Sequence, residues 1–155
     1  MNRKTAREIA VELCFAAAAN GVDTDELVDS FFSEEHYTTL GTEDELFSAK
    51  PDETQLAYIR TLTRLSREKA EELDDMIERY ARGWKAGRIS RTARAVLRIA
   101  LCKILYMDDI PAAVAINEAV ELDKGYDDAE TVAFVNGVLG GFMRGEMAAE
   151  EQEKE

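Results

Sequence analysis

Several residue types are scarce in this chain of 155 residues, and their scarcity excludes whole classes of site. His36 is the one histidine, so motifs with paired histidine ligands cannot form. Cys14 and Cys102 belong to no CxxC pair, which favours two buried free thiols in a reducing compartment. No apolar run approaches the roughly 18 residues of a membrane span, and the N-terminus lacks an apolar signal core. We therefore expect a cytoplasmic protein.

Catalytic and cofactor motifs are also missing. The sequence contains no HExxH, GxGxxG, Walker loop or EF-hand register. His36 lies beside Glu34 and Glu35, where a solvated loop is favoured over a metal contact. Asp74 and Asp75 are adjacent, so on a helix they point in different directions and do not form an acid–base pair. We expect no enzyme activity, no cofactor and no metal.

Charge, in contrast, is abundant and segregated. The net charge is -13, and residues 20–55 hold eleven acids against one lysine. Residues 79–107 hold no acid and eight basic residues, and the chain begins with the basic stretch MNRKTAR. Because charges are screened over about 8 Å at physiological salt, a local basic patch can attract phosphate on an acidic protein. The basic start therefore requires an explanation.

Apolar residues follow a helical period almost throughout, and no convincing strand is found. Helices are predicted at 3–19, 24–32, 52–65, 67–82, 90–107, 112–124 and from 127 onward, with 33–51 as an acidic surface loop. Asp23 and Ser90 are suitable N-caps, and Asp127 with Glu130 has the spacing of a capping box. The predicted fold is all-α, with about seven helices in two packed bundles. One domain over 1–145 would divide into halves 1–85 and 86–145 at the joint 83–87, with 146–155 as a disordered acidic tail.

The basic start lies on the first predicted helix. Lys4, Arg7, Val11 and Phe15 fall within about 80° of one another at 100° per residue, offset from the core face. Cations can hold phosphates and an aromatic ring can stack a base, so this stripe could bind single-stranded nucleic acid. In the alternative interpretation, Phe15 packs into the core and the cations are merely solvated.

Two more polar sets each have two interpretations. Arg88, Arg91, Arg94 and Arg98 share one side of a helix, either as a ligand-binding face or as a solvated or ion-paired face. Asn117, Glu118 and Glu121 lie opposite the apolar arc of their helix. They form either a polar contact surface or an internal ion pair, for which Arg98 is the candidate partner.

Residues 95–139 resemble the NusB family of transcription antitermination factors. The most specific segments are LRIA, DDIP, VAINEAVEL and FVNGVL, in this order and spacing, and RKTAREIAVELCF resembles the start of the family's first helix. The resemblance implies two small helical bundles and no catalysis. It also implies binding of boxA-type single-stranded RNA from ribosomal RNA operon leaders, together with the ribosomal protein NusE. NusA, NusG and RNA polymerase would complete the complex, and the chain alone would be a monomer or a homodimer.

The resemblance also assigns residues. The expected RNA-binding residues are Arg3, Lys4, Arg7, Phe15, Lys124, Tyr126, Glu130 and Phe134. The expected partner-binding residues are Arg91, Arg94, Asn117, Glu118 and Gly137. Phe15 stands where many members have Tyr, and fewer cations surround Lys124, so we expect weak, salt-sensitive binding by the protein alone.

Two other functions compete with this one. NusB-like domains also occur fused to RNA cytosine methyltransferases, which makes a detached accessory role one alternative. The chain has no cofactor loop or catalytic region of its own for that reaction. A helical module that binds only protein and has lost its RNA contacts is the other alternative, and the acidic balance favours it slightly.

Overall fold

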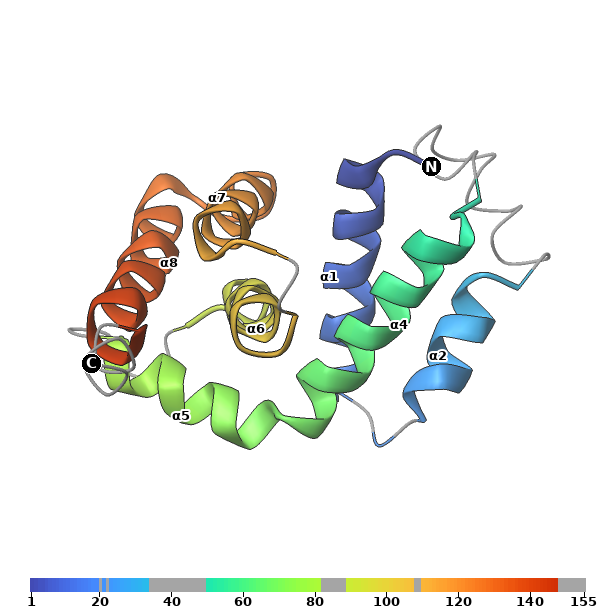
Figure 1. Cartoon of the computed structure of the whole chain (residues 1–155), viewed down its shortest axis with the longest axis horizontal. Helices are drawn as coiled ribbons and strands as arrows, with labels where there is room; N and C mark the ends of the chain where they lie inside the picture. Colours follow the sequence, from blue (N-terminus) through green and yellow to red (C-terminus); the bar gives the residue numbers. More distant parts are fainter. Residues whose placement is uncertain (20, 22, 34–49, 82–88, 108–109, 148–155) are drawn as a thin grey trace. The chain divides into compact units, whose positions relative to one another are not determined.

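The computed structural model describes residues 1–19, 21, 23–33, 50–81, 89–107 and 110–147. These residues form seven α-helices and a π-helical turn, and none of them lies in a strand (Figure 1). The helices are α1 (Arg3–Ala19), α2 (Thr24–Phe31), α4 (Glu53–Glu68), α5 (Ala70–Tyr80), α6 (Arg91–Tyr106), α7 (Ala112–Asp123) and α8 (Ala129–Phe142); the π-helical turn is Met143–Met147. The all-α prediction is confirmed, and the loop expected at 33–51 lies mostly outside the described residues.

Two compact units make up the fold, Met1–Glu68 and Lys69–Glu155. The boundary between the two halves was expected at 85/86, whereas the two compact units meet at 68/69. The reason is α5, which packs against α6 and α8 and so belongs with the second unit. The joint expected at 83–87 lies outside the described residues.

The first unit consists of α1, α2 and α4, with α4 between the other two helices (Figure 1). The predicted core face of α1 is confirmed, since Ala6, Ile9 and Leu13 are buried. From α4, Ile59 and Leu62 add two fully buried side chains. Burial of side chains of this size contributes about 1.5–3 kcal/mol each, so this apolar seam accounts for the pairing of α1 with α4.

Polar contacts fix the two outer helices of this unit. The Asp23 carboxylate accepts a hydrogen bond from the Glu26 amide at 3.0 Å, which confirms the predicted cap of α2. Arg60 on α4 pairs with Asp25 at 3.2 Å and Asp29 at 2.8 Å, so one guanidinium holds two turns of α2. Arg67 donates to the carbonyl of Ala17 in the last turn of α1.

The second unit is built around α6, which contacts α5, α7 and α8 (Figure 1). The Ser90 hydroxyl accepts from the Ala93 amide at 3.0 Å, so the predicted N-cap is confirmed. Val96, Leu97, Ala100 and Leu101 are buried as predicted. Both cysteines are buried free thiols, as expected.

Three of the four basic residues of α6 form ion pairs inside this unit. Asp74 on α5 pairs with Arg94 at 3.1 Å and with Arg98 at 2.6 Å. Burial alone raises the pKa of Asp74, but hydrogen bonds and charge from Arg98 and Arg94 outweigh it and lower the pKa. The Lys103 ammonium, almost fully buried, lies 3.1 Å from Glu118 on α7. The internal ion pair expected for the 117–121 arc therefore exists, but its cation is Lys103 and not Arg98.

The end of α8 is tied to α5 by Tyr80. A Cβ atom on Gly141 would lie 3.4 Å from the Tyr80 ring, and one on Gly145 would clash with it, so these glycines make room for the ring. Tyr80 donates to Glu146 at 2.8 Å, and Arg79 pairs with the same carboxylate. Glu146 is thus held in the fold, contrary to its expected place in a disordered tail; residues 148–155 lie outside the described part.

The turn between α7 and α8 contains a buried acid. The backbone carbonyl of Asp123 accepts from the amides of Tyr126 and Asp127, while its side-chain oxygens are buried with no donor. Burial first, then the neighbouring carboxylates of Asp127 and Asp128, raise the pKa of Asp123 to about 7. The cap of α8 is Asp128, which accepts from the Thr131 amide at 2.8 Å, so the prediction of Asp127 as the cap was wrong. Asp127 instead accepts from the Ser90 hydroxyl at 3.2 Å.

We expect Asp74→Asn to lower the free energy of unfolding by about 1–3 kcal/mol, because two largely buried guanidinium groups lose their charge partner. The matched control is Asp75→Asn, the exposed neighbour on the same helix, which should change it by less than about 0.5 kcal/mol. Urea unfolding at neutral pH measures both. Equal effects of the two variants would contradict the role of the α5–α6 ion pairs.

We expect Asp123→Asn to raise the free energy of unfolding above that of the native chain, and to do so more at pH 8 than at pH 5. The folded-state pKa of Asp123, about 7, exceeds its ordinary value of 3.8, so its contribution to stability is lost as pH rises through this window. The amide of the variant does not titrate, so its free energy of unfolding at pH 8 should exceed that of the native chain by about 1–3 kcal/mol. Unfolding curves at both pH values, with Asp75→Asn as control, test this. A difference that does not vary with pH would refute it.

Candidate nucleic-acid interface

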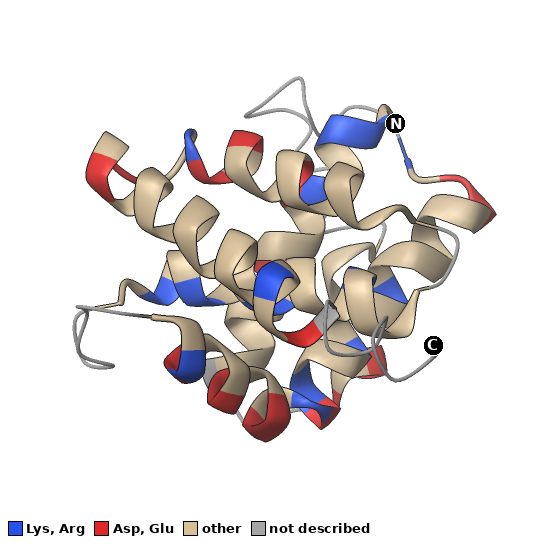
Figure 2. Ribbon diagram, turned by 60° about the vertical axis from the view of Figure 1, so that its left-hand side comes forward, with Lys and Arg blue, Asp and Glu red and all other residues tan. Residues whose placement is uncertain are grey.

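The first turn of α1 carries exposed positive charge. Asn2 caps the helix, since its side-chain oxygen accepts from the Thr5 amide at 2.7 Å. Arg3 and Lys4 follow directly, both exposed and without an ion pair to any described residue; Figure 2 shows the blue ribbon beside the N mark. The first turn contains no acid. Cations here oppose the helix dipole by about 0.3–1 kcal/mol each, so helix stability does not explain them.

The stripe predicted along α1 is only partly exposed. Phe15 keeps 38% of its surface, and Lys4, three turns earlier, lies on nearly the same side of the helix. Arg7 is half-buried, whereas Val11 is almost fully buried in the core. The prediction that Val11 shares this surface was wrong. The buried face of α1 includes Val11 as well as Ala6, Ile9 and Leu13, so it is wider than predicted. Cations and an available ring nonetheless occur on one helix.

The second set of expected RNA-binding residues lies on the α7–α8 turn and α8. Lys124, Tyr126 and Glu130 are exposed, and Tyr126 keeps 41% of its surface. The Lys124 ammonium lies 2.7 Å from Glu121, in a pair that is open to solvent on both sides. Phe134, also expected to bind RNA, is buried. It lines a cavity of about 450 Å³ with Tyr80, Gly137 and Gly141.

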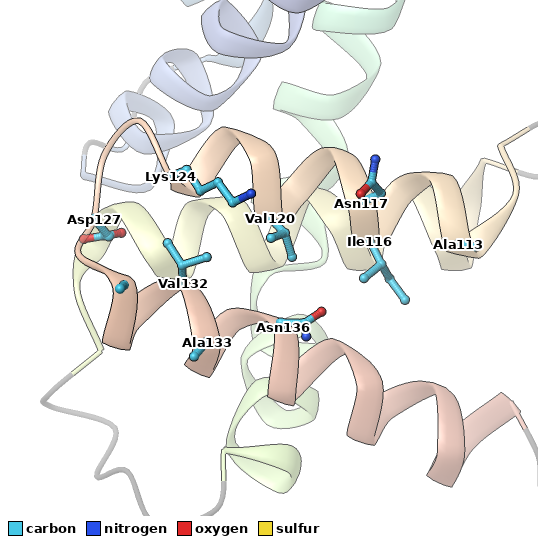
Figure 3. Close-up of a pocket in the computed structure, with 10 residues that line it drawn as sticks. Ala113, Ile116, Asn117, Val120, Lys124, Asp127, Val132, Ala133 and Asn136 are labelled. Atoms are coloured by element: carbon cyan, nitrogen blue, oxygen red, sulfur yellow. The ribbon is translucent and has the colours of Figure 1, made fainter.

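A groove of about 740 Å³ lies between α7 and α8. Ile116 and Val120 enter it from α7, and Val132 enters from α8 (Figure 3). Its polar lining consists of Asn117, Asn136, Lys124 and Asp127, and the remaining lining residues are alanines. The two charged residues lie at the end of the groove near the α7–α8 turn (Figure 3).

The expected partner-binding residues fall into two groups. Arg94 and Glu118 use their charges inside the second unit, in the ion pairs with Asp74 and Lys103. Arg91, Asn117 and Gly137 are exposed. Nothing lies within 4 Å of a Cβ built on Gly137, so this position of α8 has room for a partner.

The sequence analysis predicted neither the groove nor the buried carboxylate of Asp123. Asn136 was available from the sequence as a polar residue within a helix that has no charge between Thr131 and Phe142. Asp123 was available as an acid four residues after Ala119, on the buried side of α7. Neither residue by itself indicates a function. The groove forms only where α7 and α8 pack together, and the sequence does not show which helix faces meet.

The part of the chain that the structure describes holds no cluster of three or more His, Cys, Asp or Glu side chains able to bind a metal ion. Its helices are also too short or too polar for any of them to cross a bilayer. Among these residues, exposed cations, one exposed phenylalanine and an amide-lined groove therefore remain as candidate ligand-binding features.

Comparisons with known proteins identify the family of this chain. The model of the NusB family matches residues 4–144. The transcription antitermination protein NusB of Symbiobacterium thermophilum is 37% identical over 145 residues, covering 94% of this chain and 91% of the relative. That of Ruminiclostridium cellulolyticum is 36% identical over 150 residues, covering 97% and 94%. The solved structure of T. maritima NusB gives a TM-score of 0.75 at 26% identity and covers 99% of this chain and 98% of its own. The chain belongs to the NusB family of transcription antitermination proteins.

Proposed function

We propose that this chain binds boxA-type single-stranded RNA of ribosomal RNA operon leaders as a heterodimer with the ribosomal protein NusE. In the larger complex it acts with NusA, NusG and RNA polymerase to suppress premature termination. Membership of the NusB family supports the general role. The RNA and the partner are inferred from the family resemblance and from the exposed residues of α1 and the α7–α8 turn.

The observation that carries RNA binding is the first turn of α1. Arg3 and Lys4 are exposed cations at the end of a helix where the free backbone amides and the dipole also attract anions. A protein with a net charge of -13 gains no solubility from two cations at this position. A phosphate would satisfy the cations and the helix end together.

Base stacking supplies the second half of this proposal. Phe15 offers an exposed ring further along α1, and Tyr126 offers another on the α7–α8 turn. Stacking on an aromatic ring is tolerant of base identity, and sequence preference then requires contacts to base edges. Selectivity for boxA-type RNA is therefore expected to depend on polar groups beyond the two rings.

A module that binds protein and has lost RNA is the second candidate. The acidic side chains of Glu8 and Glu12 lie on the outer part of α1 and weaken its positive field. Titrating labelled boxA-type RNA and a scrambled RNA with the chain, with and without NusE, separates the two functions. Selective binding that tightens with NusE supports the first, and association with NusE without any RNA binding supports the second.

We expect Arg3→Ala and Lys4→Ala each to weaken RNA binding and to reduce the salt dependence. With about 3–5 phosphate contacts, log Kd against log salt should have a slope of magnitude roughly 2–3.5, and each lost contact lowers it by about 0.7. The matched control is Arg64→Ala, which removes an exposed cation from α4. Fluorescence anisotropy at several salt concentrations measures the slope. A native slope near zero would contradict phosphate binding.

We expect Phe15→Ala to weaken RNA binding by about 1–3 kcal/mol without changing the salt slope, because it removes stacking and no charge. Phe15→Tyr keeps the ring and should retain native affinity. Because Phe15 is partly exposed, both variants should remain folded, which circular dichroism checks. Unchanged affinity of Phe15→Ala would place the stacked bases elsewhere.

A further inference from the structure

We propose that the groove between α7 and α8 receives one unstacked base of the RNA, with its phosphate on Lys124 and its edge at Asn117 and Asn136. This base site presupposes the RNA binding proposed above and adds a specific contact to it. The groove extends from the α7–α8 turn, where Lys124 and Tyr126 are exposed, so it is continuous with the second set of expected RNA-binding residues.

The interior of the groove suits a flat, uncharged group. Ile116, Val120 and Val132 project into it from both helices (Figure 3), and alanines complete the apolar lining. Its volume of about 740 Å³ is within the usual range of about 300–1,000 Å³ for small-ligand pockets. A base can lay its apolar face on these aliphatic side chains, whereas a phosphate would lose its hydration among them.

Two amides supply the means to recognise a base edge. Asn117 lies on the α7 wall and Asn136 on the α8 wall, and neither side-chain amide forms a hydrogen bond with another described residue. Each amide offers two N–H donors and one carbonyl acceptor, which match the mixed donors and acceptors of base edges. An aliphatic ligand would leave these amides unsatisfied.

The charges at one end orient the nucleotide. Lys124 is paired with Glu121, but both side chains are more than half exposed, and such pairs are worth only about 0–1 kcal/mol. A phosphate can therefore replace Glu121 at the ammonium. Asp127 accepts from the Ser90 hydroxyl and adds a negative charge at the same end. This charge lies where the phosphate is proposed to bind and weakens the attraction of Lys124, so the apolar lining is what keeps phosphate out of the interior and leaves that part to the base.

The surroundings of the groove favour one nucleotide over a longer bound strand. Between Thr131 and Phe142 α8 has no charged residue, and Figure 2 shows a long tan stretch of this helix. The next cation along α8 is Arg144, whose guanidinium lies beside Gly140 at the far end of the helix, beyond the residues that line the groove. We expect the rest of the strand to leave the groove past Lys124 and Tyr126, where the first phosphate is bound.

Replacing single bases by abasic sites along a short boxA-type RNA tests the site. We expect the native chain to lose affinity at one position, and the Asn117→Ala/Asn136→Ala variant to bind unmodified RNA about fivefold or more weakly. In that variant the same abasic site should cost nothing further, which is the coupling expected of a direct contact. Its salt slope should match the native one, whereas Lys124→Ala should lower the slope by about 0.7.

Val114→Ala is the control, because Val114 is exposed on α7 but does not line the groove. It should bind every RNA as the native chain does, and thermal melts should show all variants folded. RNA binding that needs Arg3 and Lys4 but is unchanged in the double asparagine variant would overturn the base site alone. Loss of NusE association in that variant, with RNA affinity intact, would do the same and assign the groove to a protein. No RNA binding by the native chain would overturn both proposals.

Discussion

Ion pairs between α6 and its neighbours stabilise the second unit and determine which cations remain for a ligand. Arg94 and Arg98 share the Asp74 carboxylate, and Lys103 is buried against Glu118. Removing one partner of such a pair leaves a charge in a poorly solvated place, so these cations cannot easily turn outward. Three of the four basic residues of α6 therefore have a structural role.

Of the cations that stay exposed among the described residues, we assign three to RNA. Arg3 and Lys4 occupy a helix end that already attracts anions, and Lys124 lies on the turn beside the α7–α8 groove. The net charge of -13 repels phosphate overall, so binding should depend on these positions rather than on total charge. Apolar and amide groups near them then supply contacts to bases, which is where selectivity arises.

Local signals predicted most of the fold and part of the site. The helical period located the helices of the described residues, and Asp23 and Ser90 were recognisable caps because each bonds an amide three residues later. Pairing across helices was not predictable: the ion-pair interpretation of the 117–121 arc named Arg98, whereas Glu118 pairs with Lys103, and Glu146 in the π-helical turn bonds to Tyr80. Of the two phenylalanines expected to bind RNA, Phe15 is exposed and Phe134 is buried, a difference that the sequence could not predict because burial depends on the facing helix. The same limit hid the groove, whose walls come from two helices.

Ultraviolet cross-linking of boxA-type RNA to the native chain with NusE, followed by mass spectrometry of the linked peptides, tests the central claim most directly. RNA bound at the start of α1 should give cross-links in the peptide that contains Phe15, since an exposed ring stacked on a base reacts efficiently only at contact distance. A scrambled RNA should give few. Cross-links confined to NusE, with none on this chain, would contradict RNA binding by α1.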